Sequence, residues 1–261
     1  MAVATGSYVY DQSWTEEHKR LAGMEALLDP GTERVIDSLG IAPGWRCLEV
    51  GAGAGSIARW MGERVGPEGS VLATDVSTRH LTDLDAPNVE VREHDILSDP
   101  LPEEEFDLVH ARLLVEHLGR PALERMLPPL RPGGWLVLED YDTGGAAVYP
   151  DDTGAGAVID AVLDFMSRSG FDPELGRKLT HELERAGLEE VGAEGSVPIY
   201  RGGTAATDFL RLSIKSLSEQ VVEAGMLTRE QIEAGLARLD DPEATVLHAT
   251  SVAAWGRKPG P

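Results

Sequence analysis

Cysteine is almost absent from this chain of 261 residues, because Cys47 is the only one. A single thiol excludes an intramolecular disulfide. The neighbours Trp45, Leu48 and Val50 are apolar, so we expect a buried thiol in a strand without a redox role. The sequence is therefore compatible with a reducing compartment but does not require one.

Basic side chains are also few, 23 against 45 acidic ones, which gives a formal net charge of −22. Nonspecific nucleic-acid binding depends on Lys and Arg that neutralise phosphates, so we expect no nucleic-acid partner. Anionic membrane surfaces are disfavoured for the same reason. The chain has no apolar run of about 18 residues, and residues 1–10 lack the features of a signal peptide. We expect a soluble, cytoplasmic protein without a membrane partner.

Strand-like and helix-like patterns alternate in the first half of the chain. The expected strands are 46–50, 70–74, 89–93, 106–110 and 135–139, and the expected helices are 56–65, 78–84 and 121–130. Parallel neighbours need crossover connections, which are usually helices. The order therefore predicts an α/β fold with a doubly wound parallel sheet.

Helical segments flank this core. Ser13 and Glu16 have capping-box spacing at the start of an N-terminal helix, which Asp29-Pro30-Gly31 is expected to end before a second helix at 32–39. The glycine-rich stretch 143–156 is either a substrate lid or a tether. After it we expect helices at 157–169, 172–187, 204–224 and 228–239, strands at 191–200 and 245–255, and a capping box at Thr228 and Gln231.

These patterns divide one domain into four parts. They are an N-terminal helical cover (1–40), a ligand-binding core (41–142), a lid or cap insertion (143–240) and a last strand with its tail (241–261).

The sharpest motif is the glycine-rich loop between the first strand and its helix, Glu49-Val50-Gly51-Ala52-Gly53-Ala54-Gly55-Ser56. Ligands of open parallel sheets bind beyond the carboxyl ends of the strands, where this loop lies. Glycine permits positive φ and close approach of ligand atoms to the backbone. Acidic residues follow at the next two strand ends. Asp75 can accept from both hydroxyls of a ribose, and Asp95 from an adenine amino group, with Ile96 covering the ring.

The loop favours a cationic ligand over a dinucleotide. The G-x-G-x-x-G pattern needs a third glycine where Ser56 stands, and Glu49 would repel a pyrophosphate. We expect Glu49, Asp75 and Asp95 to surround S-adenosylmethionine, which carries a sulfonium and an ammonium group.

An ordered series of motifs over about residues 40–140 resembles the class I S-adenosylmethionine-dependent methyltransferases of small molecules. The motifs are Glu49 to Gly55, Asp75, Asp95, Phe106-Asp107-Leu108-Val109 and Leu130-Arg131-Pro132-Gly133-Gly134-Trp135. The resemblance implies a mostly parallel seven-stranded, Rossmann-like sheet with a helical cap inserted before the last strands. It also implies S-adenosylmethionine as cofactor and S-adenosylhomocysteine as product.

The resemblance further implies which residues hold this cofactor. Glu49 would organise the loop, and either Arg20 or Arg112 would meet the methionine carboxylate. The Arg131–Gly134 turn is interpreted as a reversal of the chain into the fifth strand, not as a contact to the ligand. The full implied set is Tyr8, Arg20, Glu49, Gly51, Ala52, Gly53, Asp75, Val76, Asp95, Ile96, Ala111 and Arg112.

Methyl transfer is an in-line displacement, so alignment supplies much of the rate and a general base is needed only where the nucleophile must lose a proton. The catalytic candidates are His117, which titrates near neutrality, and Asp140 and Tyr141 at the end of the fifth strand. Each has an alternative interpretation, His117 as a packing residue and the other two as anchors of the lid. The remaining histidines are scattered, so no metal site is expected.

We therefore predict a methyltransferase that modifies oxygen, nitrogen or carbon of a small, apolar or aromatic metabolite, with a role in bacterial secondary metabolism. Two alternatives stay open. One is an S-adenosylmethionine-binding protein that catalyses another reaction or only binds, and the other is a nucleotide-dependent oxidoreductase. The oligomeric state also stays open and includes a homodimer.

Overall fold

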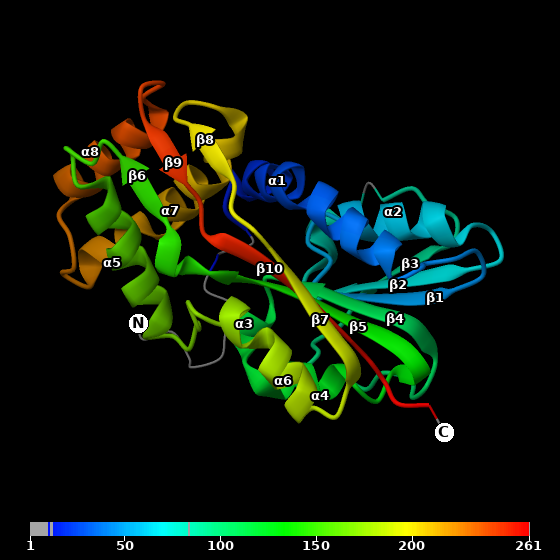
Figure 1. Ribbon diagram of the computed structural model, residues 1–261. Coiled ribbons are helices and arrows are strands. Elements are labelled where there is room, and N and C mark those ends of the chain that lie inside the picture. The colour runs from blue at the N-terminus through cyan, green and yellow to red at the C-terminus, as the bar shows by residue number, and fades with distance from the viewer. Residues whose placement is uncertain (1–9, 11–12, 83, 261) are drawn as a thin grey trace.

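The computed structural model describes residue 10 and residues 13–82 and 84–260. Its centre is a seven-stranded sheet of order β3-β2-β1-β4-β5-β10-β7 (Figure 1). The strands are β1 (Arg46–Val50), β2 (Ser70–Asp75), β3 (Val89–Glu93), β4 (Phe106–Arg112), β5 (Leu130–Asp142), β7 (Glu189–Ser196) and β10 (Thr250–Arg257). The strands β1 to β5 are parallel, whereas β10 is antiparallel to both β5 and β7. The predicted mostly parallel, seven-stranded, doubly wound sheet is confirmed.

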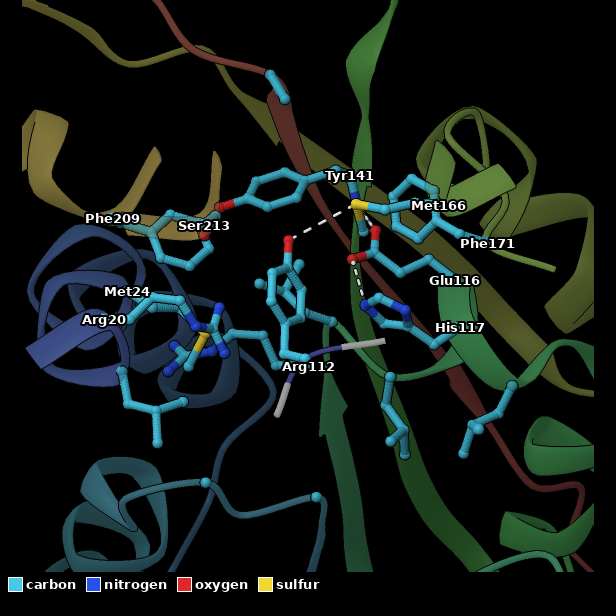
Figure 2. Close-up of a pocket in the computed structure, with 18 of the residues that line it drawn as sticks. Arg20, Met24, Arg112, Glu116, His117, Tyr141, Met166, Phe171, Phe209 and Ser213 are labelled. Carbon is cyan, nitrogen blue, oxygen red and sulfur yellow. Dashed lines mark hydrogen bonds and ion pairs between the residues drawn. The ribbon is translucent and has the colours of Figure 1, made fainter. Parts of the chain in front are cut away.

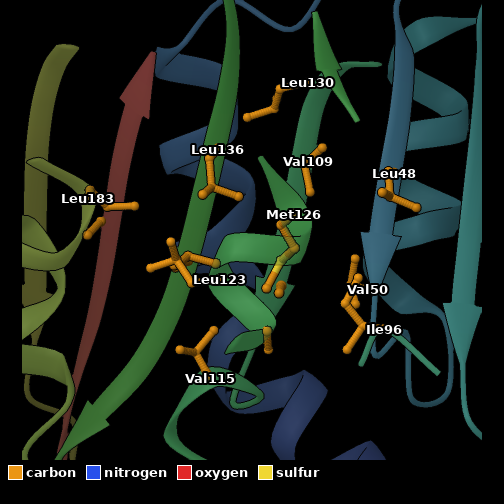
Figure 3. Close-up of a cluster of buried hydrophobic side chains, with 14 of the residues drawn as sticks. Leu48, Val50, Ile96, Val109, Val115, Leu123, Met126, Leu130, Leu136 and Leu183 are labelled. Atoms are coloured by element: carbon orange, nitrogen blue, oxygen red, sulfur yellow. The ribbon is translucent and has the colours of Figure 1, made fainter. Parts of the chain in front are cut away.

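Helices cover both faces of this sheet (Figure 1). One face carries α1 (Glu17–Ser38) and α2 (Ser56–Val65), and the other carries α3 (Val115–Leu118), α4 (Arg120–Met126) and α6 (Leu179–Arg185). Successive strand residues face opposite sides. Cys47 accordingly packs in the cluster under α1 and α2, and Leu48 in the cluster with α4 and α6 (Figure 3). The expected buried thiol in a strand is confirmed.

A cap stands beyond the carboxyl ends of the parallel strands (Figure 1). It contains α5 (Ala155–Ser167), α7 (Ala205–Glu223), α8 (Arg229–Asp240) and a small antiparallel sheet of β6 (Ala147–Tyr149), β9 (Thr245–Leu247) and β8 (Ile199–Arg201). These elements share a hydrophobic core of their own, which includes Val158, Leu217 and Ile232. The cap consists of two segments, 143–169 and 197–249, because α6 and β7 return to the main sheet between them.

The predicted helix break at Asp29-Pro30-Gly31 is wrong, since α1 continues through Pro30. Proline inside a helix removes one backbone hydrogen bond at a cost of roughly 3 kcal/mol. Packing outweighs this cost, because Leu28 lies in a cluster with residues of β5 and α7, and Ile36 lies in the core beneath α2. The predicted helix start at Ser13 is also wrong, because α1 begins at Glu17 and its N-cap is Glu16.

Other element boundaries differ from the expectations as well. The helix expected at 172–187 begins only at Leu179, after a 3₁₀ turn, η3 (Gly176–Lys178). Gly176 packs directly on the backbone of β5, where a Cβ would lie 2.8 Å from the Asp142 nitrogen, and this contact fixes the path of the turn.

The strand expected at 245–255 is divided into β9 and β10, and the one expected at 191–200 corresponds to β7 and β8. The helix expected at 78–84 is only η1 (Thr78–His80), and the stretch 143–156 contains η2 (Thr143–Gly145) and β6. The capping box of Thr228 and Gln231 is confirmed. None of the described helices has the length and apolarity needed to cross a bilayer.

Candidate active site

One cavity of about 410 Å³ extends from the carboxyl ends of the parallel strands into the cap (Figure 2). We call its two ends the slot and the cap chamber. The slot is lined by Gly51, Gly53, Asp75, Val76, Asp95 and Ile96. The cap chamber is lined by Glu116, His117, Tyr141, Ile159, Met166, Phe171, Phe209, Ser213, Ile214 and His248.

The glycine-rich loop is tied to the neighbouring strand by its backbone. The N–H groups of Gly51 and Ala52 donate to the Thr74 carbonyl at 2.8 and 2.9 Å. Gly51 and Gly53 have φ of +74° and +59°, the left-handed region that glycine enters without strain. At Gly51 a Cβ would also lie 3.2 Å from Leu114 Cδ1. The loop therefore presents bare backbone to the slot, as the sequence predicted.

Two of the three predicted acids meet in the slot. Asp75, the last residue of β2, accepts hydrogen bonds from the N–H groups of Gly53 at 3.0 Å and Ser77 at 3.1 Å. Asp95 accepts from the Leu97 N–H at 2.9 Å, in a turn that places Ile96 against the cavity. Both carboxylates are held by backbone donors, so their orientation is fixed before any ligand arrives.

Glu49 faces away from the slot, so the expected convergence of three carboxylates is wrong. It is absent from the described cavity lining, and its Oε1 lies 3.6 Å from Nδ1 of His110 under α1. His110 Nε2 lies 3.2 Å from Glu139 Oε1. Burial opposes the charged ring, but the two glutamates outweigh it and raise the pKa of His110 to about 9. Glu49 belongs to a buried ion-pair network beneath the loop.

Both candidate arginines line the cavity, and each is already paired. Arg20 donates to both carboxylate oxygens of Glu17, at 2.7 and 2.8 Å, and its guanidinium lies 4.2 Å from the Tyr10 ring centre. Arg112 donates to Asp29 at 2.8 Å. Arg20 and Glu17 thus present adjacent positive and negative groups beside the loop.

The remaining cofactor predictions divide into three groups. Val76 and Ile96 line the cavity, Ala52 and Ala111 are buried outside the described lining, and Tyr8 lies outside the described residues. An aromatic residue nearby was missed: Tyr10 lines the cavity and donates its hydroxyl to Met166 Sδ at 3.6 Å. Its position depends on contact with α5, which no local motif encodes.

Of the catalytic candidates, His117 and Tyr141 line the cap chamber (Figure 2). Asp140 is buried and is not among the described lining residues. Burial and the positive charge of Arg20 lower the pKa of His117 to about 3, so its ring is neutral at pH 7. Asp140 Oδ1 accepts the backbone N–H of Glu116 at 3.2 Å. Asp140 therefore positions a neighbour instead of reaching the cavity.

That neighbour, Glu116, is the acidic residue that sequence reasoning missed. Its Oε2 accepts the Tyr141 N–H at 3.0 Å, and its Oε1 lies 3.8 Å from His117 Nε2 (Figure 2). Burial and the nearby Asp140 raise the pKa of Glu116 well above its usual value. The sequence feature that could have revealed Glu116 is its position next to His117, on the short helix α3 that follows β4.

The described residues contain no group of three or more His, Cys, Asp or Glu side chains placed to hold a metal ion. The cavity instead offers a polar slot, a largely apolar chamber and, in the chamber wall, the buried carboxyl of Glu116. Such a site can align two molecules and accept a proton.

Comparisons with known proteins agree with this geometry. Residues 47–134 match the family model described as a methyltransferase domain. Methyltransferase str2 of Strobilurus tenacellus is 33% identical over 144 residues, which are 53% of this chain and 51% of that protein. The chain spans about half the length of the curated relatives it matches.

Solved structures share the fold at low identity. YcgJ protein of Bacillus subtilis has a TM-score of 0.58 at 15% identity, over 88% of this chain and 98% of that one. Geranyl diphosphate C-methyltransferase of Streptomyces coelicolor A3(2), solved with Mg²⁺, geranyl diphosphate and S-adenosyl-L-homocysteine, has a TM-score of 0.52 at 14% identity. That match covers 98% of this chain and 90% of the solved one, so it includes the cap.

Proposed function

Because this chain belongs to the class I S-adenosylmethionine-dependent methyltransferases, we propose that it binds S-adenosylmethionine in the slot and methylates a small, apolar or aromatic metabolite in the cap chamber. One observation carries the proposal: a single cavity joins the slot to the chamber, so two molecules can meet inside it. The net charge of −22 supports a small-molecule acceptor over a nucleic acid. A cytoplasmic location, a role in secondary metabolism and a homodimeric assembly stay predictions.

The residues of the slot fit this cofactor. Asp75 accepts from the ribose hydroxyls, and Asp95 accepts from the adenine amino group beside Ile96. Glu17 and Arg20, which are paired beside the loop, complement the ammonium and carboxylate of the methionine portion. When bound, S-adenosylmethionine supplies a methyl group activated by its sulfonium.

The chamber residues align the acceptor and remove its proton. Apolar side chains exclude water from the chamber and hold the acceptor beside the slot. Alignment of this kind lowers the activation barrier by on the order of 7–11 kcal/mol. We assign the role of general base to Glu116 in its ionised form, because it lines the cavity and its raised pKa makes the ionised carboxylate a stronger base. Asp140 holds Glu116 in place, and neutral His117 forms the adjoining wall.

Calorimetry with S-adenosylmethionine and S-adenosylhomocysteine tests the slot. Incubation of the protein with tritiated methyl donor and a small-molecule extract tests the transfer. We expect both ligands to bind and label to appear in an extractable small molecule. Failure of both ligands to bind overturns the proposal, and binding without labelled product favours the non-methyl alternative.

A further inference from the structure

The cap chamber contains a polar corner within its apolar walls. Tyr141 Oη, Ser213 Oγ and His248 Nε2 are buried and have no hydrogen-bond partner among the described residues. The three residues, from β5, α7 and the link between β9 and β10, are 7%, 7% and 5% exposed, and all line the cavity. The Tyr141 and His248 ring centres are 5.2 Å apart, and Figure 2 shows the Tyr141 ring extending towards Ser213 and Phe209. Buried polar atoms are nearly always paired, so three together point to a ligand.

The hydrogen-bonding role of His248 is fixed by its neighbour. Its Nδ1 lies 3.3 Å from the Ala249 carbonyl oxygen, and a carbonyl can only accept, so Nδ1 carries the proton. Burial lowers the pKa of His248, which keeps the ring neutral at pH 7. Nε2 therefore presents a lone pair and requires a donor on the ligand. The hydroxyls of Tyr141 and Ser213 can donate in return.

The charges around the chamber disfavour an anionic ligand. Among the described lining residues the arginines are Arg20 and Arg112, and each is paired with a carboxylate, Glu17 or Asp29. No lysine is among these lining residues, and Glu116 adds a carboxyl group of its own. An acceptor that carries only a phosphate or carboxylate would have to displace one of these ion pairs, whereas the methionine portion brings an ammonium for Glu17 together with its carboxylate for Arg20.

We propose that Tyr141, Ser213 and His248 bind the hydroxyl group of an uncharged, otherwise apolar acceptor. The hydroxyl donates to His248 Nε2 and accepts from Tyr141 Oη or Ser213 Oγ. The description of this ligand as the methyl acceptor rests on the proposed function, whereas the hydroxyl site itself does not. Phosphorylated and carboxylated molecules are excluded from the chamber.

The test uses 2-naphthol, naphthalene and 2-naphthyl phosphate as probes, titrated calorimetrically with and without saturating S-adenosylhomocysteine. We expect 2-naphthol to bind about tenfold more tightly than naphthalene, as two net hydrogen bonds would give. We expect 2-naphthyl phosphate to bind more weakly than 2-naphthol. Equal affinity for 2-naphthol and naphthalene, tighter binding of the phosphate, or no binding of 2-naphthol overturns the inference.

Three variants locate the hydroxyl site. Tyr141→Phe and Ser213→Ala each remove one hydroxyl group, and His248→Phe removes both ring nitrogens. We expect His248→Phe to lower 2-naphthol affinity about fivefold while naphthalene affinity is kept. Ile232→Val, in the cap core and outside the described cavity lining, is the control and should keep the preference for 2-naphthol. A preference that survives all three polar variants contradicts the proposal.

S-adenosylhomocysteine binding in the same titrations separates the two proposals. If S-adenosylhomocysteine does not bind, only the proposed function is contradicted, because the preference of the free protein for 2-naphthol still supports the hydroxyl site. If S-adenosylhomocysteine binds but 2-naphthol binds no more tightly than naphthalene, only the hydroxyl site is contradicted.

Discussion

His110 lies with its Nε2 3.2 Å from Glu139 Oε1, in the buried layer between the sheet and α1. Glu49 approaches the other ring nitrogen, and Thr32 of α1 donates to Glu139 at 3.0 Å. A charged imidazole between two carboxylates thus lies below the glycine-rich loop. This network joins the first helix to three neighbouring strands, and we expect it to make the stability of the protein depend on pH.

The folded-state pKa of His110 is raised from 6.5 to about 9, so the protonated ring stabilises the fold. This stabilisation is fully present below pH 6.5 and is lost as the pH rises through about 9. We expect the free energy of unfolding to fall by about 3 kcal/mol between pH 6.5 and 9.5, measured by urea denaturation. His110→Gln should be less stable at pH 6.5 and lose less on going to pH 9.5. An identical slope in the variant would contradict this assignment.

Asp75→Ala should weaken S-adenosylhomocysteine binding about 10- to 150-fold, because it removes a charged acceptor worth roughly 1.5–3 kcal/mol. Calorimetry measures the change. Glu103→Gln, an exposed acid in the loop before β4, is the control and should bind normally. Unchanged affinity in Asp75→Ala would show that the ribose lies elsewhere.

Glu116→Gln should slow methyl transfer roughly 10²- to 10⁴-fold with unchanged cofactor affinity, as loss of a general base requires. It should also stabilise the fold at pH 8. The raised pKa of Glu116 means that the folded state favours the protonated carboxyl, and that stability is lost as the pH rises through the folded-state value. Glutamine is neutral throughout and avoids the loss.

The two readouts are tritium transfer and urea denaturation at pH 5 and pH 8. His117→Phe provides the comparison, and we expect it to retain more activity than Glu116→Gln. If the order of activities is reversed, the base is His117.

Cys47 is fully buried in β1, and burial raises the pKa of its thiol above the usual value for cysteine. Thiolate, which is the reactive form, is therefore scarce and inaccessible in the folded protein. We expect no reaction with Ellman's reagent in buffer and one thiol per chain in 6 M guanidinium chloride. Rapid labelling of the native protein would contradict the burial of this strand.

The slot could be predicted from the sequence because its parts are local. Strand periodicity places Gly51, Asp75 and Asp95 at the same edge of a parallel sheet, and topology brings them together. The direction of the Glu49 side chain was predicted wrongly. The alternation of side chains along a strand shows that Glu49 lies on the same face of the sheet as Cys47, but it does not show which helix covers that face.

The cap chamber could not be predicted in the same way. Ser213 and His248 belong to no motif, and they meet Tyr141 only because α7 and the β9–β10 link fold back over β5. Pro30 illustrates the same limit. Its local signal ends a helix, but packing on both halves of α1 keeps the helix continuous.

The register of β10 determines which changes of the cap chamber the main sheet can accommodate. Ser251 pairs with Ser196 of β7, and Thr250 pairs with Asp142 of β5, so the cap segments leave and rejoin the sheet at adjoining rungs. Lengthening or replacing residues 197–249 changes the connection between β7 and β10 but leaves the pairing of β10 with β5 and β7 intact. Insertions or exchanges in this connection can therefore remodel the cap segment that carries Ser213 and His248, while the sheet edge at Gly51 and Asp75 keeps its framework of paired strands.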